Sequence, residues 1–243
     1  MTGYPELRRR AERARAAGVP AAFRGTARRA LIAWIDAAAT HGLDPREAML
    51  QLRDGAAAIE AGRAALEGQI ADPAGPMAKA GCAMGCAFCC ILKGDDGGTI
   101  SGAEARRLHA ALAPLAGSPD GRAWHPDACP ALDPKTRTCR AYDARPMICR
   151  SYISPDAALC EQLAKGEPVA GPGVLGGHGL YLSVLALTRE TLKGITAVPT
   201  HSMAGIAASA VAGETIEAAL AATKHAPRGL SDEIARHRAA LKG

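Results

Sequence analysis

The chain has 243 residues, of which 48% are hydrophobic and 22% are charged, and its formal net charge is +5. This balance is typical of a folded globular protein and excludes an intrinsically disordered chain. Aromatic residues make up only 3%, whereas 55 residues are alanine, the strongest helix former. The composition therefore predicts a mainly α protein and argues against a β-sandwich, a barrel or a large parallel sheet.

Residues 1–75 are predicted to form an N-terminal helical unit. A helix is expected over residues 5–17, before the break at Gly18-Val19-Pro20, and a second over 21–40, where apolar residues recur at helical spacing. Asp44 and Pro45 fit an N-cap followed by proline at the first helical position. The helix that begins there is predicted to continue to about residue 70, before the proline- and glycine-rich run 72–76.

The N-terminal helices are strongly basic. A basic helix can dock on an acidic protein partner, and we keep such a partner as one hypothesis. No aromatic residues alternate with the arginines and no nucleic-acid-binding module is visible, so the sequence argues against binding of nucleic acid. The arginines of the first 30 residues face only two glutamates and are Arg8, Arg9, Arg10, Arg13, Arg15, Arg24, Arg28 and Arg29.

Eight cysteines are confined to one third of the chain. They are Cys82, Cys86, Cys89, Cys90, Cys129, Cys139, Cys149 and Cys160. A disulfide scaffold needs an oxidising compartment, yet the N-terminal residues carry no apolar signal-peptide core. No stretch has the ~20 unbroken apolar residues that span a bilayer. We therefore expect a cytoplasmic, reduced protein without a membrane partner, in which the clustered thiols hold metal.

The first cysteine group has the spacing C-x3-C-x2-C-C, with small residues between the thiols. Four thiolates in a tetrahedron suit zinc, and cubane iron–sulfur clusters use the same ligands. The neighbouring side chains of Cys89 and Cys90 must point in different directions. One of the two is therefore expected to serve a different centre, or a different face of the same cluster.

The second cysteine group is spaced by ten, ten and eleven residues, which fits a loop that returns repeatedly to the first group. Eight thiols could fill two four-coordinate sites, and two zinc ions with eight thiolates carry a charge of about −4. Basic residues that could compensate this charge alternate with the ligands, namely Lys135, Arg137, Arg140, Arg145 and Arg150. Residues 76–165 are therefore predicted to be an irregular, metal-nucleated segment. One helix is expected within it, over residues 102–115, opened by a capping box at Ser101 and Glu104.

The full pattern resembles the YkgJ-type cysteine-cluster family, to which zinc or iron chelation is attributed. The resemblance covers about residues 78–162 and includes C-P-x-L-D from Cys129 and C-x2-Y-x2-R-P-x2-C-R-x-Y from Cys139. It implies that all eight cysteines are metal ligands. One relative, the flagellin lysine methylase, looks similar in its cysteine cluster, and this implies a methyltransferase that uses S-adenosylmethionine as an alternative function.

The first three cysteines also resemble the radical-SAM signature, C-x3-C-x-Phe88-C, in which an iron–sulfur cluster leaves one iron open for S-adenosylmethionine. Enzymes of that kind build a β/α barrel after the motif. Here a cysteine-rich loop and alanine-rich helices follow, with no succession of strands. A full radical-SAM fold is therefore not expected.

Residues 166–243 are predicted to form a C-terminal helical unit. Residues 171–176 match G-x-G-x-x-G in letters, but no convincing strand precedes them, and we interpret them as a connector. The apolar run 180–187 is predicted to be a buried helix or strand, and helices are expected near 203–223 and 231–242.

Together these patterns predict a cytoplasmic metalloprotein that binds an iron–sulfur cluster or zinc through eight cysteines. The first alternative is an S-adenosylmethionine-dependent methyltransferase resembling flagellin lysine methylase. The second is a metal-handling or partner-binding module that docks through its basic N-terminal helices. Whether the protein is an enzyme stays open at this point.

Overall fold

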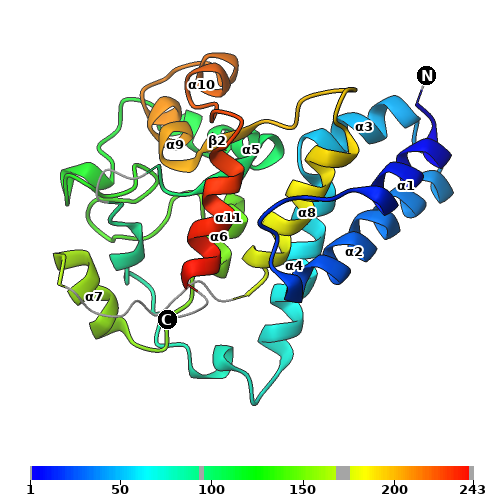
Figure 1. Cartoon of the computed structure of the whole chain (residues 1–243). Helices are drawn as coiled ribbons and strands as arrows, with labels where there is room; N and C mark the ends of the chain where they lie inside the picture. Colours follow the sequence, from blue (N-terminus) through cyan, green and yellow to red (C-terminus); the bar gives the residue numbers. More distant parts are fainter. Residues whose placement is uncertain (1, 93–95, 168–175, 241–243) are drawn as a thin grey trace.

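The computed structural model describes residues 2–92, 96–167 and 176–240 (Figure 1). Over these residues the chain forms eleven α-helices, several 3-10 turns and two short strands, which confirms the mainly α prediction. The N-terminal helices are α1 (Tyr4–Arg13), α2 (Ala21–Thr40), α3 (Pro45–Arg53) and α4 (Ala56–Ala71). Helix α2 has the predicted bounds, because its apolar stripe and the preceding proline are purely local signals.

The single helix predicted from residue 45 to about residue 70 is wrong, because the chain turns between α3 and α4. Gly55 adopts φ 98°, in the left-handed region that favours glycine. A Cβ atom at this position would lie 2.5 Å from the Cβ atom of Ser101. The glycine is therefore required both by the turn and by the close approach of a distant segment.

The middle of the chain is largely irregular, as predicted. Its elements are the 3-10 turns η1 (Pro76–Lys79), η2 (Phe88–Cys90), η3 (Ala113–Leu115), η4 (Gly121–Ala123) and η5 (Tyr142–Ala144), strand β1 (Thr99–Ser101), and helices α5 (Gly102–Leu112), α6 (Met147–Ser151) and α7 (Ala157–Lys165). The predicted capping box of α5 is confirmed, since Ser101 and Glu104 each accept the other's main-chain N–H. Helix α7 was not predicted; Asp156 caps it by accepting from Leu159 N at 2.9 Å.

The C-terminal part is helical, with one strand. It contains α8 (His178–Thr191), β2 (Thr200–Ser202), α9 (Met203–Val211), α10 (Ile216–Ala222) and α11 (Gly229–Ala240). The apolar run is thus a helix, and the helix predicted near 203–223 is two helices separated at Gly213, which has φ 80°. Most of the G-x-G-x-x-G segment lies outside the described residues. In the described part of the chain the only sheet is the antiparallel pair β1–β2, so no β/α barrel is seen there.

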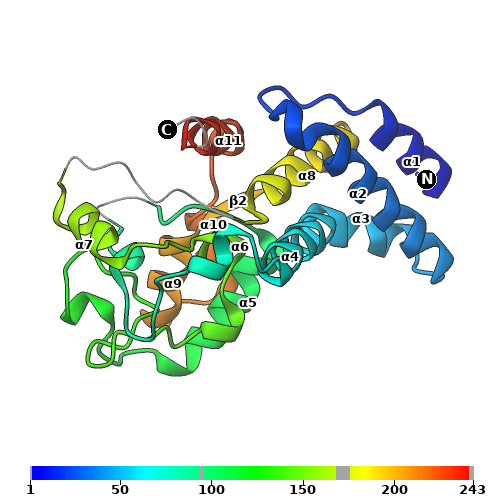
Figure 2. The same ribbon diagram turned by 90° about the horizontal axis from the view of Figure 1, so that it is seen from below.

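Two hydrophobic clusters organise the molecule. The first joins α1–α4 with α8 and α11, and α8 packs directly against α2 and α4. The second joins α5, α9 and α10 with the cysteine-rich segment. Figure 2 shows α1–α4 and α8 on one side of the molecule and α5, α7 and α9 on the other. The division into units 1–75, 76–165 and 166–243 stays a prediction, and each hydrophobic cluster combines residues from more than one of these ranges.

Across residues 2–92, 96–167 and 176–240, no helix combines the length and the apolar character that crossing a bilayer requires.

Candidate metal centre

All eight cysteines are free thiols, and they sit on irregular backbone or short elements. Cys82 and Cys86 precede η2, and Cys89 and Cys90 lie within it. Cys149 lies on α6 and Cys160 on α7. Short elements and loops leave the chain free to direct several side chains towards one centre, which a long helix or strand could not do.

The start of the first cysteine group lies against the segment that leads to Cys160. Gly81 N donates to Ser154 O at 2.8 Å, and Ser154 N donates to Cys82 Sγ at 3.5 Å. Helix α7, which carries Cys160, also packs on η2. Burial raises the pKa of Cys160, and the charges of Cys89, Cys86 and Cys82 raise it further. We call Cys82, Cys86, Cys89 and Cys160 the outer set.

The remaining four cysteines are joined by main-chain contacts and by the second hydrophobic cluster. Cys129 N donates to Cys90 O at 2.8 Å, and the flanking Ile91 and Ala128 form an antiparallel bridge. A second bridge joins Leu132 to Cys139. All four thiol-bearing residues, Cys90, Cys129, Cys139 and Cys149, belong to that cluster or pack on it, and none of the outer set does. We call these four the inner set.

The electrostatics of the thiols depend on burial, and they link the two sets through Cys89. Burial raises the pKa of Cys129 to about 12 and the pKa of Cys149 well above its usual range. The charges of Cys139 and Cys89 raise the pKa of Cys129 further, and those of Cys129, Cys139 and Cys89 do the same for Cys149. By contrast, the pKa of Cys89 is lowered to about 7, first because Cys90 hydrogen-bonds to it. Metal binding to the inner set would therefore release protons, since thiolate is the ligand form.

Two of the five basic residues predicted to compensate thiolate charge act on the thiols. Arg145 draws down the pKa of Cys139 and Cys149 against the larger effect of burial, and Arg140 does so for Cys139. Arg137 instead lies over the ring of Trp124, 5.6 Å from its centroid. Arg145 also lowers the pKa of Cys89, so its charge acts on thiols of both sets.

Over the residues that the structure describes, the sulfur atoms do not form finished coordination shells. In the described part of the chain, no three Cys, His, Asp or Glu side chains stand close enough together to hold an ion as they are. Coordination at the Zn–S distance of about 2.3 Å would require the thiols of each set to move closer together. The donor chemistry itself, four thiols in each set and none in a disulfide, fits zinc or iron.

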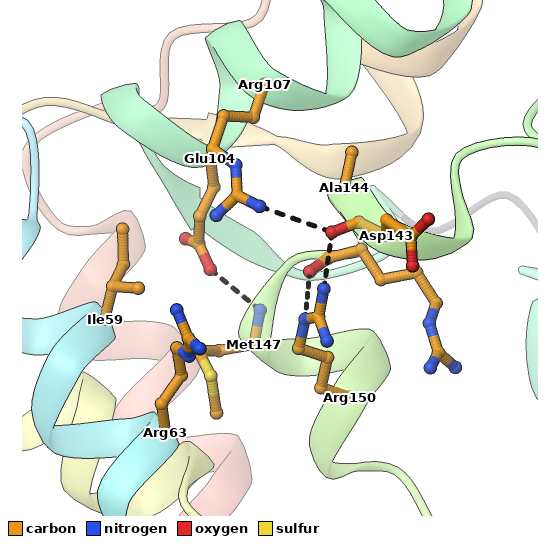
Figure 3. A pocket seen from close by; sticks show the side chains of 9 residues that line it. Ile59, Arg63, Glu104, Arg107, Asp143, Ala144, Met147 and Arg150 are labelled. Atoms are coloured by element: carbon orange, nitrogen blue, oxygen red, sulfur yellow. Dashed lines mark hydrogen bonds between the residues drawn. The ribbon is translucent and has the colours of Figure 1, made fainter.

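A pocket that the sequence did not predict lies beside the inner set. It has a volume of about 170 Å³ and lies between α4, α5 and α6. Figure 3 shows Arg63, Arg107 and Arg150 reaching it from these three helices. The pKa of Arg150 is lowered by burial and then by the charges of neighbouring arginines. The motif R-P-x-x-C-R was the available signal, because its two arginines, Arg145 and Arg150, both line the pocket.

Comparison with known proteins bears on the cysteine-rich segment alone. Residues 81–165 match the family model CxxCxxCC, described as "Putative zinc- or iron-chelating domain". The matched range runs from just before Cys82 to the end of α7 and so includes all eight cysteines. No curated protein and no solved structure matches the chain. The match confirms the resemblance to a cysteine-cluster family drawn from the sequence.

Proposed function

We propose that the cysteine-cluster domain at residues 81–165 is the working part of a cytoplasmic metalloprotein, and that its eight thiols hold an iron–sulfur cluster or zinc in two separate centres. The observation that carries this proposal is that eight free thiols, four of them in or against the second hydrophobic cluster, lie within a segment that matches a zinc- or iron-chelating family. Four thiolates are a complete ligand set for either kind of centre.

The division of ligands assigns the adjacent cysteines of η2 to different centres. Cys89 belongs with the outer set, where α7 brings Cys160 towards η2. Cys90 belongs with the inner set, because its carbonyl oxygen accepts a hydrogen bond from Cys129 N. Adjacent side chains diverge, so two neighbouring thiols serve two centres more easily than one.

Bound metal would stabilise the irregular part of the domain. Residues 117–146 contain only short 3-10 turns, and the second hydrophobic cluster includes few large side chains from this region. Ligand bonds can replace a hydrophobic core in holding such a segment together. Bound zinc would supply cross-links between distant segments, and a bound cluster would add electron transfer. Four thiolates leave no open position on zinc, which favours a structural role for that ion.

Arg140 and Arg145 compensate part of the negative charge of the metal-bound thiolates. Deprotonated thiols and a divalent ion leave net negative charge on each centre. Arg145 interacts electrostatically with Cys89, Cys139 and Cys149, and thus faces members of both sets. Loss of this charge should weaken metal binding without removing a ligand.

Metal analysis of protein isolated without oxygen tests the proposal. Zinc would give a colourless protein with two ions per chain, and iron–sulfur would give a brown protein containing iron and acid-labile sulfide. Cys82→Ser and Cys129→Ser serve as matched variants, one for each set. Each should lose one centre and keep the other, whereas full metal content in both variants would contradict the ligand assignment.

The methyltransferase and the partner-binding module stay predictions. Calorimetry with S-adenosylmethionine tests the first, since an enzyme of that class must bind its methyl donor. Binding to an acidic protein through α1 is the test of the second. Some arginines of α1 are already paired within the chain, Arg8 with Asp36 and Arg10 with Glu6.

A further inference from the structure

The lining of the arginine-rich pocket contains no thiol, although one of its arginines, Arg145, also acts on Cys139 and Cys149. Its charged lining residues come from segments far apart in the sequence: Arg63 from α4, Glu104 and Arg107 from α5, Asp143 from η5, Arg145, and Arg150 from α6. Arginine side chains repel one another, and four of them around one cavity need negative charge to balance them. The group that supplies this negative charge must therefore be identified.

The guanidinium groups bond mainly to carbonyl oxygens. Arg107 Nη2 and Arg150 Nη2 both donate to Asp143 O, at 3.3 and 2.6 Å, and Arg150 Nε donates to Arg145 O at 2.8 Å. Within the described residues, no carboxylate forms an ion pair with Arg107, Arg145 or Arg150. Each guanidinium has five N–H donors, so most remain available to a ligand or to water.

The buried acid of the pocket already has its full complement of partners. Glu104 accepts from Ser101 N, Ser101 Oγ, Met147 N and Tyr181 Oη, at 2.5 to 3.0 Å. Its carboxylate thus forms a fixed part of the wall. The lining contains four arginines and the two acids Glu104 and Asp143, so it carries a net charge of +2.

We infer that this pocket binds a phosphate group, either as the free ion or as the terminal group of a small phosphate monoester. The planar guanidinium group of arginine can donate two parallel hydrogen bonds to the oxygen atoms of one phosphate. A doubly charged phosphate also balances the net charge of the lining. The volume of about 170 Å³ corresponds to five or six waters at about 30 Å³ each. It is smaller than the ~300–1,000 Å³ of sites that enclose larger ligands.

A second arginine-rich hollow, between α1 and α8, has a lining of the same net charge but pairs its arginines differently. It is lined by Arg9, Arg10, Arg13 and Arg15 together with two glutamates. One of these acids, Glu6, pairs with Arg9 and with Arg10. Two arginines of that hollow are therefore ion-paired with an acid of its own lining. In the pocket between α4, α5 and α6, by contrast, Arg63 pairs at 4.0 Å with Glu67, which does not belong to the lining.

Calorimetric titration of the full chain with inorganic phosphate tests the inference, using Arg107→Gln and Arg106→Gln as a matched pair. Both residues are exposed on α5, but Arg106 pairs with Asp54 and does not line the pocket. Arg107→Gln should weaken phosphate binding about tenfold. Arg106→Gln should change it by less than about twofold. Arg63→Gln, from α4, is a second pocket variant and should resemble Arg107→Gln.

Comparison of ligands identifies the source of the phosphate group. If inorganic phosphate binds more tightly than phenyl phosphate, the ligand is the free ion. If phenyl phosphate binds more tightly, the ligand is a monoester. Either result supports a phosphate site. Tighter binding of malonate than of either phosphate would overturn it. So would a dissociation constant above about 1 mM for every phosphate, or equal weakening in the Arg106 and Arg107 variants.

Discussion

Tyr181 Oη donates a 2.5 Å hydrogen bond to the carboxylate of Glu104, and both side chains are buried. This bond links α8, in the first hydrophobic cluster, to α5 beside the second. Glu104 also accepts from Met147 N at 2.7 Å, two residues before Cys149. One buried carboxylate thus connects α8, the α5 cap and the segment that carries an inner thiol.

Tyr181→Phe should destabilise the protein by about 1.5–3 kcal/mol, because it removes a hydrogen bond to a buried charged group. Urea denaturation followed by circular dichroism measures this loss. Tyr142→Phe is the control, since Tyr142 is 60% exposed. Its substitution should shift the free energy of unfolding by less than about 0.5 kcal/mol. Equal effects of the two substitutions would remove the proposed link between α8 and α5.

Gly55→Ala should be strongly destabilising, and Gly68→Ala should not. A Cβ at residue 55 meets Ser101 Cβ at 2.5 Å and also requires a left-handed backbone, which alone costs about 1–3 kcal/mol. Gly68 lies inside α4 with nothing within 4 Å of an added Cβ. Alanine there should stabilise the helix by up to about 1 kcal/mol. Thermal unfolding of both variants measures this difference. Similar midpoint temperatures for the two variants would contradict the prediction.

His201 should make stability fall as the pH is lowered from about 6.5 to 4. Burial and then the charge of His225 lower the pKa of His201 from 6.5 to about 4. The unfolded chain therefore binds a proton at a higher pH than the folded chain does. The stability that depends on neutral His201 is complete above pH 6.5 and is lost progressively down to about pH 4, amounting to about 3 kcal/mol.

The comparison of His201→Asn with His41→Asn measures this contribution. Urea titrations at several pH values between 4 and 7 should show a flatter pH dependence for His201→Asn than for the unaltered chain. His41 is exposed at the end of α2, so its substitution should leave the slope unchanged. Identical slopes in all three proteins would mean that His201 is not the group responsible.

A chelator should remove metal from the outer set first. Cys82 and Cys89 are exposed, and only Cys160 of the outer set is buried. The inner set contains no exposed thiol, and Cys129 is packed in the second hydrophobic cluster. Release should therefore occur in two phases, followed with a colorimetric indicator. Cys82→Ser should lack the fast phase and Cys129→Ser the slow one. A single phase for the unaltered chain would argue against two separate centres.

Local signals in the sequence determined much of this protein. The repeat of apolar residues between Pro20 and His41 placed α2 correctly, because helix periodicity and chain breaks act over neighbouring residues. The capping box at Ser101 and Glu104 was identified for the same reason. The cysteine spacing, together with the residues around Cys129 and Cys149, indicated the family, since thiol ligands must recur at particular intervals to meet at one centre.

Only the tertiary structure decided which distant groups become neighbours. The break at Gly55 depends on Ser101, and the pocket depends on arginines from three helices. The grouping of Cys90 with Cys129 follows from a main-chain bond between segments almost forty residues apart. Periodicity cannot encode such contacts, because burial, charge and close approach arise from the packing of segments against one another and not from the residues next in the chain.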